Sequence, residues 1–221
     1  MAQDISDDQS STSSPLQGRV ALVTGVSRSI GIAATLAQRL HHLGATVAAT
    51  GWVPHDVEMP WGADPLPFDV AQHDLEDSRA PGALIDEVVD EHGRIDIVVA
   101  VHARSSQVSF ADVTATELDR CWAANVRSIV LLAQRFAERH EPAPADHSPT
   151  GRMIWFTSGQ HIAPMDGEIA YAVSKGALHQ MTSSIDHALS AQRIVANCIN
   201  PGPVDTGYAP PDLHRRIASM F

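Results

Sequence analysis

Residues 18–50 read GRVALVTGVSRSIGIAATLAQRLHHLGATVAAT, and this stretch decides the fold. Its start, RVALVTG, is a β-branched apolar run that ends in glycine, the pattern of a buried parallel strand. Apolar residues then recur at spacings of four, four and three from Ile32 to Leu43, and Gly44 follows where a helix C-cap glycine belongs. The next run, ATVAAT, is a second strand. Strand, glycine turn, helix and strand make a βαβ unit, whose crossover should be right-handed.

The same alternation continues to the carboxyl end. Further strands are expected at PLPFDV (65–70), RIDIVVAV (94–101), RMIWFTS (152–158) and RIVANCIN (193–200). Helices are expected from about Pro81 to His92, after the capping box Thr114–Glu117, and around Tyr171, whereas four prolines predict a loop between Val53 and Pro67. The chain is therefore predicted to form an α/β fold, a Rossmann-like doubly wound parallel sheet of about six strands with helices on both faces.

Composition bounds the possible functions. The 221 residues are 44% hydrophobic without a long apolar run, so we expect one domain over 18–221 after a disordered, acidic and Ser-rich tail over 1–17. Fifteen basic against twenty-six acidic residues give a net charge of −11, which argues against nucleic acid or an anionic membrane surface as partner. Cys121 and Cys198 have no CxxC spacing, so no metal site is expected, and a cytoplasmic location fits.

Tyr171 and Lys175 would share one face of a helix because they are four residues apart. Lys175 is the only lysine of the chain, which indicates that this position needs a compact ammonium and not a guanidinium. An ammonium near a phenol lowers the phenol pKa from about 10 toward neutrality, so that the phenol exchanges a proton near working pH. Taken alone, the pair is equally compatible with an ordinary, partly exposed contact.

Asn125 interrupts an otherwise apolar stripe that includes Leu118, Trp122 and Phe136. A buried amide without partners costs on the order of 1–3 kcal/mol, so we expect Asn125 to bind water, a backbone group or a catalytic neighbour. The alternative is a structural amide in a kinked helix.

The turn TGVSRSIGIA (24–33) places Gly25 and Gly31 at the start of a helix, where free backbone N–H groups attract phosphate. A tight strand-to-helix turn without a ligand would have the same pattern. Arg28 in this turn is a candidate phosphate ligand or an ordinary exposed arginine. No carboxylate occurs at Thr50, Gly51 or Trp52, at the end of the second strand, which together with Arg28 favours NADPH over NADH.

From Gly18 to about Thr206 the chain resembles the short-chain dehydrogenase/reductase family. Ser158 lies thirteen residues before Tyr171 and, with Tyr-x-x-x-Lys and Asn125 on the preceding helix, resembles the Asn-Ser-Tyr-Lys tetrad of that family. The resemblance implies an NADP(H)-dependent oxidoreductase that interconverts a ketone or aldehyde and an alcohol. Tyr171 would exchange the proton, Ser158 would bind the reacting oxygen, Lys175 would hold the nicotinamide ribose and Asn125 would anchor a water.

The resemblance also implies the cofactor contacts and the assembly. Asp69 and Val70 resemble the adenine-contacting pair, and Val204 and Thr206 the residues at the nicotinamide carboxamide. The substrate would be a small carbonyl compound or alcohol, and the assembly a homodimer or homotetramer. The full set of cofactor residues is Gly25, Ser27, Arg28, Ile30, Gly31, Asp69, Val70, Ala100, Tyr171, Lys175, Pro201, Gly202, Val204 and Thr206.

Three departures from the family pattern accompany the match. AVHA (100–103) replaces the usual Asn-Asn-Ala-Gly after the fourth strand. The glycine turn either has one extra residue, with Ala33 for its last glycine, or has Ser29 for its middle one. The chain ends soon after Thr206, so we expect a domain that lacks the family's last helix and strand.

Two other functions remain as alternatives. One is a catalytically silent regulator or partner-dependent subunit that binds the cofactor. The other, serine hydrolysis through Ser158 and His161, lacks a GxSxG elbow.

Overall fold

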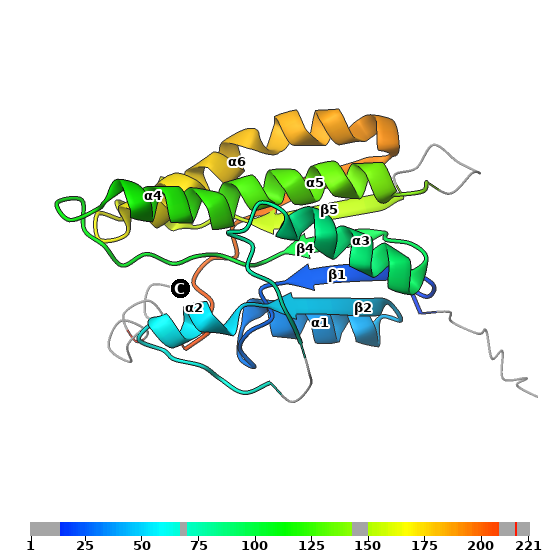
Figure 1. Cartoon of the computed structure of the whole chain (residues 1–221), viewed down its shortest axis with the longest axis horizontal. Helices are drawn as coiled ribbons and strands as arrows, with labels where there is room; N and C mark the ends of the chain where they lie inside the picture. The colour runs from blue at the N-terminus through cyan, green and yellow to red at the C-terminus, as the bar shows by residue number, and fades with distance from the viewer. Residues whose placement is uncertain (1–13, 67–69, 143–149, 208–214, 216–221) are drawn as a thin grey trace, which may run out of the picture.

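The computed structural model describes residues 14–66, 70–142, 150–207 and 215, and within them six strands form one parallel sheet (Figure 1). The strands are β1 (Val20–Thr24), β2 (Thr46–Gly51), β3 (Ala71–Gln72), β4 (Ile97–Ala100), β5 (Gly151–Phe156) and β6 (Ile194–Ile199). Their order in the sheet is β3-β2-β1-β4-β5-β6, and every neighbouring pair is parallel. The predicted Rossmann-like fold is confirmed, and its strand order reverses between β1 and β4, where such sheets bind ligands.

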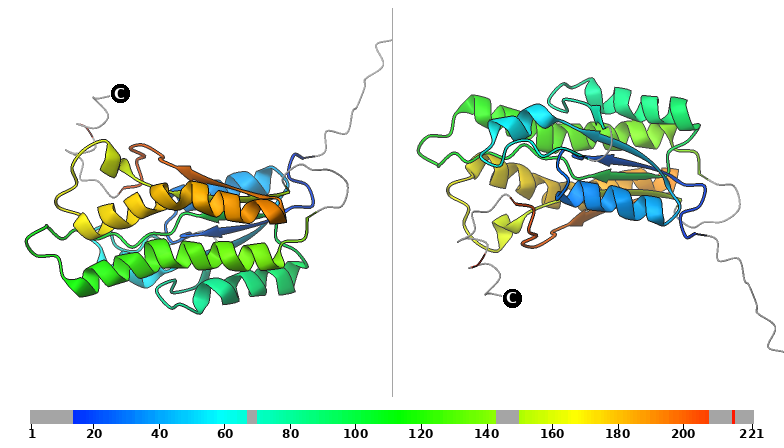
Figure 2. Two further views of the ribbon diagram at one scale, coloured as in Figure 1. Left: turned by 90° about the horizontal axis from the view of Figure 1, so that it is seen from above. Right: turned by 90° about the horizontal axis from the view of Figure 1, so that it is seen from below.

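Helices cover both faces of this sheet. Figure 2 shows α1 on one face and α3, α5 and α6 on the other. The helices are α1 (Ile32–His42), α2 (Val53–Glu58), α3 (Ala80–His92), α4 (Ala115–Trp122), α5 (Ser128–Arg139) and α6 (Ile169–Leu189), with shorter helical turns η1 (Ala123–Arg127), η2 (Gly159–His161) and η3 (Ser190–Gln192). Two expected boundaries are found: α3 ends at Gly93 in the left-handed conformation with φ 76°, and the Thr114 side chain caps α4.

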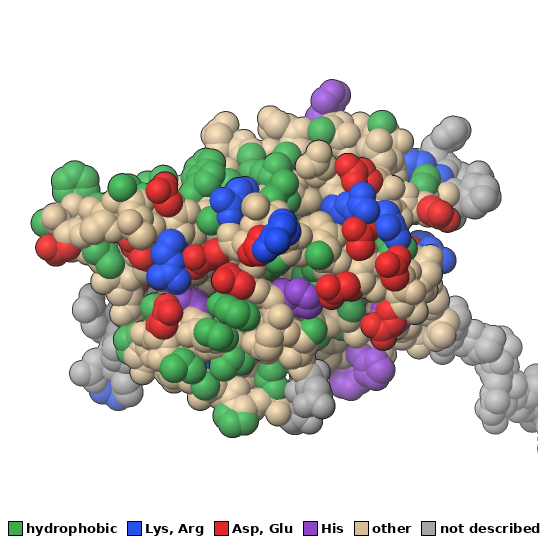
Figure 3. Space-filling view, viewed as in Figure 1, with side chains coloured by type: hydrophobic (Ala, Val, Ile, Leu, Met, Phe, Trp, Pro, Cys, Tyr) green, Lys and Arg blue, Asp and Glu red, His purple; other side chains and the backbone are tan. Residues whose placement is uncertain are grey.

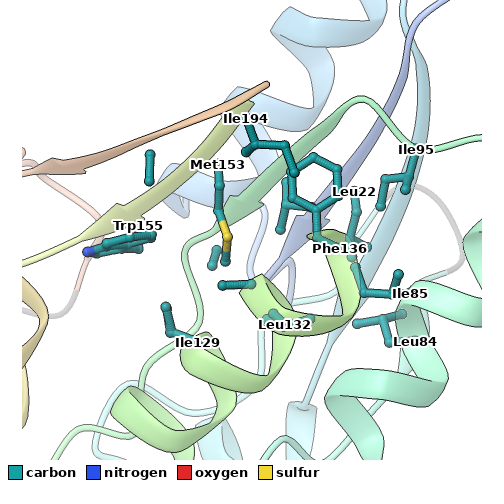
Figure 4. Packing of buried hydrophobic residues seen from close by; sticks show 14 of the residues in the cluster. Leu22, Leu84, Ile85, Ile95, Ile129, Leu132, Phe136, Met153, Trp155 and Ile194 are labelled. Carbon is teal, nitrogen blue, oxygen red and sulfur yellow. The ribbon is translucent and has the colours of Figure 1, made fainter. Parts of the chain in front are cut away.

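Alternation along the strands divides the core into two clusters. On β1, Leu22 packs with α3, α5 and α6, while Ala21 and Val23 pack with the alanines of α1. In Figure 4, Phe136 of α5 lies close to Leu22. Because successive strand residues point to opposite faces, the continuous apolar run of β1 is buried on both sides.

Ion pairs join the outer surfaces of α3 and α5. Arg135 and Arg139 of α5 each reach Asp86 of α3 at 2.7 Å. In Figure 3, basic and acidic side chains gather on this face of the molecule. Such partly exposed pairs contribute on the order of 1 kcal/mol or less each, so they mainly fix the register of two helices that the core already holds.

Two predictions between β2 and α3 were wrong. The expected loop after Val53 begins with the six-residue helix α2, because Pro54 lies in its first turn, where the missing N–H is not needed. The described third strand is Ala71–Gln72, which pairs with Thr50 and Gly51 and follows the expected PLPFDV segment. The described part of that segment therefore precedes the strand, and Asp69 lies outside the described residues.

The structured part of the chain begins before Gly18. Gln17 donates its backbone N–H to the Ser14 carbonyl at 2.9 Å, and Leu16 donates to the Leu43 carbonyl at 2.9 Å. The Leu16 side chain also packs against the α1 cluster. Residues 14–17, which were expected within the tail, are thus ordered against the α1–β2 connection, whereas 1–13 lie outside the described residues.

The apolar stripe expected across Asn125 is interrupted. Leu118 and Trp122 of α4 are 38% and 49% exposed, whereas Phe136 of α5 is fully buried. Between the two helices lies η1, a π-helical turn, whose extra residue rotates α4 relative to α5. The apolar side chains on the two sides of η1 therefore do not form one buried stripe. Among the described residues, no helix is long and apolar enough to cross a membrane.

Candidate active site

A cavity of about 700 Å³ opens at the carboxyl ends of the central strands. The predicted site residues that line it are Gly25, Ser27, Arg28, Gly31, Ser158, Tyr171, Pro201, Gly202, Val204 and Thr206. Asn125, Ala100 and Lys175 do not line it and are buried. Ile30 is 51% exposed, and Val70 packs against the α1 cluster. Most of the predicted set therefore lies in or directly behind the wall of one cavity.

Lys175 is held beneath Tyr171 by the end of β5. Its ammonium donates a hydrogen bond to the Phe156 carbonyl at 2.9 Å and lies 5.6 Å from the centroid of the Tyr171 ring. Burial lowers the pKa of Lys175 to about 8. The Thr157 hydroxyl donates to the Lys175 carbonyl at 2.8 Å, which fixes α6 against the strand end. The Tyr171–Lys175 pair is thus a packed arrangement and not a mobile surface contact.

Asn125 satisfies its buried amide with the backbone of Arg104 and with α6. Its Oδ1 accepts from the Arg104 N–H at 2.6 Å, while its Nδ2 donates to the Arg104 carbonyl at 3.0 Å and to Ser174 Oγ at 2.8 Å. Ser174 in turn donates to the Tyr171 carbonyl at 2.7 Å. A backbone group is thus among its partners, as expected, and the other partner is Ser174, on the same helix as Tyr171. Asn125 lies in the π-helical turn, a conformation that often occurs at functional sites.

Ser158 follows β5 and faces the same cavity as Tyr171. Its backbone N–H donates to Gln160 Oε1 at 3.2 Å, and Gln160 Nε2 donates to the Thr157 hydroxyl at 3.0 Å. Gln160 therefore braces the turn that carries Ser158, a role that sequence reasoning did not assign to it.

His102 is a site residue that sequence reasoning missed, although AVHA was recognised as a departure. Its Nε2 lies 3.0 Å from the Ala124 carbonyl and 2.8 Å from Ser128 Oγ. A carbonyl only accepts, so we assign the proton to Nε2, and Nδ1 then accepts from the Thr24 hydroxyl at 2.6 Å. Burial, followed by the charge of Lys175, lowers the pKa of His102 to about 3. A neutral imidazole thus joins the ends of β1 and β4 to the turn before α5.

Arg104 is a second residue that the sequence did not single out. Its side chain is 8% exposed, lines the cavity and contacts Glu76 and Glu117 at 3.3 Å each. The Ser105 N–H donates to His55 Nε2 at 3.1 Å, so α2 is attached beside it. Through its backbone Arg104 also holds Asn125, whose amide donates to Ser174 of α6, so Arg104 connects α2 and α4 to α6.

The glycine turn packs directly against the end of β4. A Cβ at Gly25 would lie 2.6 Å from the His102 backbone nitrogen, and its φ of 80° also disfavours a side chain. Gly31 is the N-cap of α1. Gly51 has no room for a side chain either, because its Cβ would overlap the Val26 carbonyl. At positions 25 and 51 the neighbouring backbone lies so close that only glycine, which has no side chain, fits.

Helix α2 and the α2–β3 connection each bring a carboxylate that the absence of acid at 50–52 did not anticipate. Asp56 lines the cavity and accepts from Trp61 Nε1 at 2.9 Å. Asp64 accepts from the Ser29 N–H at 2.8 Å and from Ser29 Oγ at 2.6 Å. Arg28 lies over the Trp61 ring, with its Cζ 5.7 Å from the centroid. Ser29 and Trp61, which lie next to Arg28, are thus hydrogen-bonded to carboxylates, which the sequence did not indicate.

The residues that follow β3 also line the cavity. They are His73, Asp74, Leu75 and Glu76. Because the observed strand is Ala71–Gln72, the pair after its carboxyl end is Asp74–Leu75 and not Asp69–Val70. The Asp69–Val70 assignment therefore followed from the misplaced third strand.

The fold and this site are those of a dinucleotide-binding oxidoreductase, with a Tyr-x-x-x-Lys helix beside a cavity at the carboxyl ends of the strands. The family model for short chain dehydrogenases matches residues 19–215, and the chain belongs to this family. Its members are oxidoreductases that act on CH–OH or C=O groups with NAD(P) and take small-molecule substrates.

Known relatives agree with this assignment. "Uncharacterized oxidoreductase YjdA" of Bacillus subtilis is 28% identical over 213 residues, covering 93% of this chain and 82% of that protein. A short-chain dehydrogenase/reductase from Serratia marcescens superposes with a TM-score of 0.76 at 28% identity, covering 94% of this chain and 84% of that one. A short chain dehydrogenase from Burkholderia cenocepacia in complex with NADP gives 0.72 at 30% identity, with coverage of 89% and 79%.

Proposed function

We propose that this chain is an NADP(H)-dependent reductase or dehydrogenase that interconverts a ketone or aldehyde and an alcohol, with Tyr171 as general acid and base. The observation that carries the proposal is the shared cavity of Ser158 and Tyr171, with the buried Lys175 ammonium 5.6 Å from the tyrosine ring centroid. A positive charge at this position stabilises negative charge on the phenolic oxygen.

Besides Lys175, the other three residues of the tetrad have separate tasks. Tyr171 gives a proton to the carbonyl oxygen in reduction and takes it back in oxidation, while the Ser158 hydroxyl donates a hydrogen bond to that oxygen. Asn125 and Ser174 hold the first turns of α6 in place through hydrogen bonds of 2.8 Å and 2.7 Å. The nicotinamide supplies or accepts the hydride when bound, and the protein provides orientation and electrostatics.

The cavity wall fits a phosphorylated dinucleotide. Gly25 leaves space where a side chain would overlap neighbouring backbone, and Gly31 caps the helix whose N-terminus faces the turn. The buried Arg28 Nε has no hydrogen-bond partner among the described residues, which supports Arg28 as ligand of a 2′-phosphate. Asp74 and Leu75 replace Asp69 and Val70 as the proposed adenine contacts, because they line the cavity after β3.

Titration of the purified chain with NADPH and NADH, followed by tryptophan fluorescence, tests the cofactor part of the proposal. We expect NADPH to bind more tightly. Equal affinities, or tighter binding of NADH, would contradict the assigned preference. Binding without turnover of any carbonyl compound would favour a catalytically silent protein.

Tyr171→Phe tests the catalytic part. We expect carbonyl reduction to fall by at least about a thousandfold, because the proton donor is lost, and NADPH affinity to stay within a few-fold. Tyr208→Phe, at the only other tyrosine, is the matched control and should keep normal turnover. Normal turnover in Tyr171→Phe would remove this residue from the mechanism.

We further propose that copies of the chain pair through α4, α5 and α6, as a homodimer or within a homotetramer. These helices expose Trp122 (49%), Val130 (37%) and Val173 (54%) on their outer surfaces. Apolar side chains on neighbouring helices are typical of interfaces between subunits.

A further inference from the structure

The segment between α2 and β3 folds over the glycine turn through three contacts. Asp64 accepts from the Ser29 N–H at 2.8 Å and from Ser29 Oγ at 2.6 Å. The Trp61 ring lies against Arg28, and its Nε1 donates to Asp56 at 2.9 Å, which attaches the segment to α2. A loop some thirty-five residues away in sequence thus occupies donors of the turn.

The Ser29 donors would suit a phosphate oxygen as well as a carboxylate. A backbone N–H and a hydroxyl that converge at the start of a helix bind oxyanions. The hydrogen bonds from Ser29, its side chain first, hold the pKa of Asp64 below its ordinary value. Asp64 is therefore ionised near neutral pH, and it lies in the field of Arg28. An incoming phosphate monoester, which carries a charge of about −1.5 to −2 near pH 7, would be repelled by it.

We propose that Asp64 is a specificity-determining residue that weakens binding of the 2′-phosphorylated cofactor. Its carboxylate accepts the Ser29 hydrogen bonds beside Arg28. A 2′-phosphate therefore binds either after the Asp64 side chain has moved away from Ser29, or next to the Asp64 carboxylate and against its charge repulsion. NADH carries no such group and escapes this competition. The inference rests on the proposed function, because it takes Arg28 as the ligand of the 2′-phosphate.

The test uses Asp64→Asn, which keeps an acceptor oxygen and the shape but removes the charge, and Asp64→Ala, which removes both. Each variant is titrated with 2′,5′-ADP and 5′-ADP as probes, and then with NADPH and NADH. We expect both variants to bind 2′,5′-ADP and NADPH at least about fivefold more tightly than the native chain, since one charge repulsion is removed. Affinities for 5′-ADP and NADH should stay within about twofold.

Asp112→Asn is the matched control. Asp112 is also an exposed carboxylate that accepts from a serine hydroxyl, Ser109 Oγ, at 2.6 Å. Neither Asp64 nor Asp112 lines the cavity, but only Asp64 is hydrogen-bonded to the glycine turn beside Arg28. The substitution changes the net charge of −11 by the same single unit as Asp64→Asn. Its affinities should therefore stay within about twofold, and an equal gain in this control would overturn the role of Asp64.

The remaining outcomes separate this inference from the proposed function. Unchanged or weaker binding of 2′,5′-ADP in both Asp64 variants overturns the inference, even where the native chain binds NADPH and reduces carbonyls. Tighter NADPH binding in the variants without turnover in any form supports the inference and refutes the proposed catalysis. If no form binds a 2′-phosphorylated nucleotide, the inference and the cofactor preference are both overturned.

Discussion

Replacing His102 by Ala restores the residue type that the family usually has at this position, yet we expect it to destabilise the chain near neutral pH. The imidazole accepts a 2.6 Å hydrogen bond from Thr24, whose side chain is fully buried. Without that acceptor, the hydroxyl loses a partner at a cost of about 1–3 kcal/mol. His102 lines the cavity, so water can enter the vacated space and keep the total near about 2 kcal/mol at pH 7.5.

The same substitution should become nearly neutral in mild acid. The pKa of His102 is lowered to about 3 from the ordinary 6.5. Below pH 6.5 the unfolded chain takes up a proton that the folded chain does not, so native stability falls as pH decreases toward about 3. At pH 5 this amounts to roughly 2 kcal/mol, since one pH unit corresponds to about 1.4 kcal/mol. His102→Ala lacks this loss, so the difference between the two proteins should shrink to about zero.

Urea unfolding at both pH values measures this difference directly. Thr24→Val and the double variant complete a cycle at pH 7.5, and their coupling with His102→Ala should be about 1 kcal/mol. His42→Ala removes an exposed imidazole and should stay within about 0.5 kcal/mol at both pH values. The reasoning is refuted if His102→Ala differs from the native chain equally at pH 7.5 and pH 5.

Two other predictions concern α4 and α6. Lys175→Met should abolish turnover but stabilise the fold at pH 7 by about 1–2 kcal/mol. Because the pKa of Lys175 is lowered in the folded state, folding disfavours its charged form below pH 10.5, and methionine removes this cost. The loss of the hydrogen bond to the Phe156 carbonyl offsets part of the gain. Lower urea stability of this variant at pH 7 would contradict it. Trp122→Glu should convert the proposed dimer to a monomer in sedimentation velocity, with unchanged far-UV dichroism; an unaltered oligomer would exclude α4 from the interface.

The pattern of residues within each segment was sufficient to predict most of the strands and helices. The strands β1, β2, β4, β5 and β6 and the helices α1, α3 and α6 follow from apolar periodicity and capping residues within each segment. The third strand could not be found in this way, because β3 is only two residues long and is defined by its pairing with Thr50 and Gly51. The misplaced strand also explains why the sequence led to Asp69–Val70, and not to the proposed Asp74–Leu75, as the adenine contacts.

The tetrad of Asn125, Ser158, Tyr171 and Lys175 stays a prediction, made from residue types and spacing. The structure places Ser158 and Tyr171 on one cavity and the Lys175 ammonium 5.6 Å from the centroid of the tyrosine ring. The sequence indicated that Asn125 needed buried partners, but the partners themselves, Arg104 and Ser174, were visible only in the structure. The π-helical turn that carries Asn125 leaves no composition signal, and it explains why Trp122 is exposed while Phe136 is buried.

The sequence by itself determined most of the individual strands and helices, whose alternation indicates a parallel α/β sheet, together with the glycine turn and the Tyr171–Lys175 pair. Each of these elements is specified by residues close to one another in the chain. Only the tertiary structure decided what surrounds them. His102 meets Thr24 across seventy-eight residues, and Asp64 meets Ser29 across thirty-five. Such contacts arise from strand order and loop path, and no local periodicity specifies which distant polar groups a parallel sheet brings to the same edge.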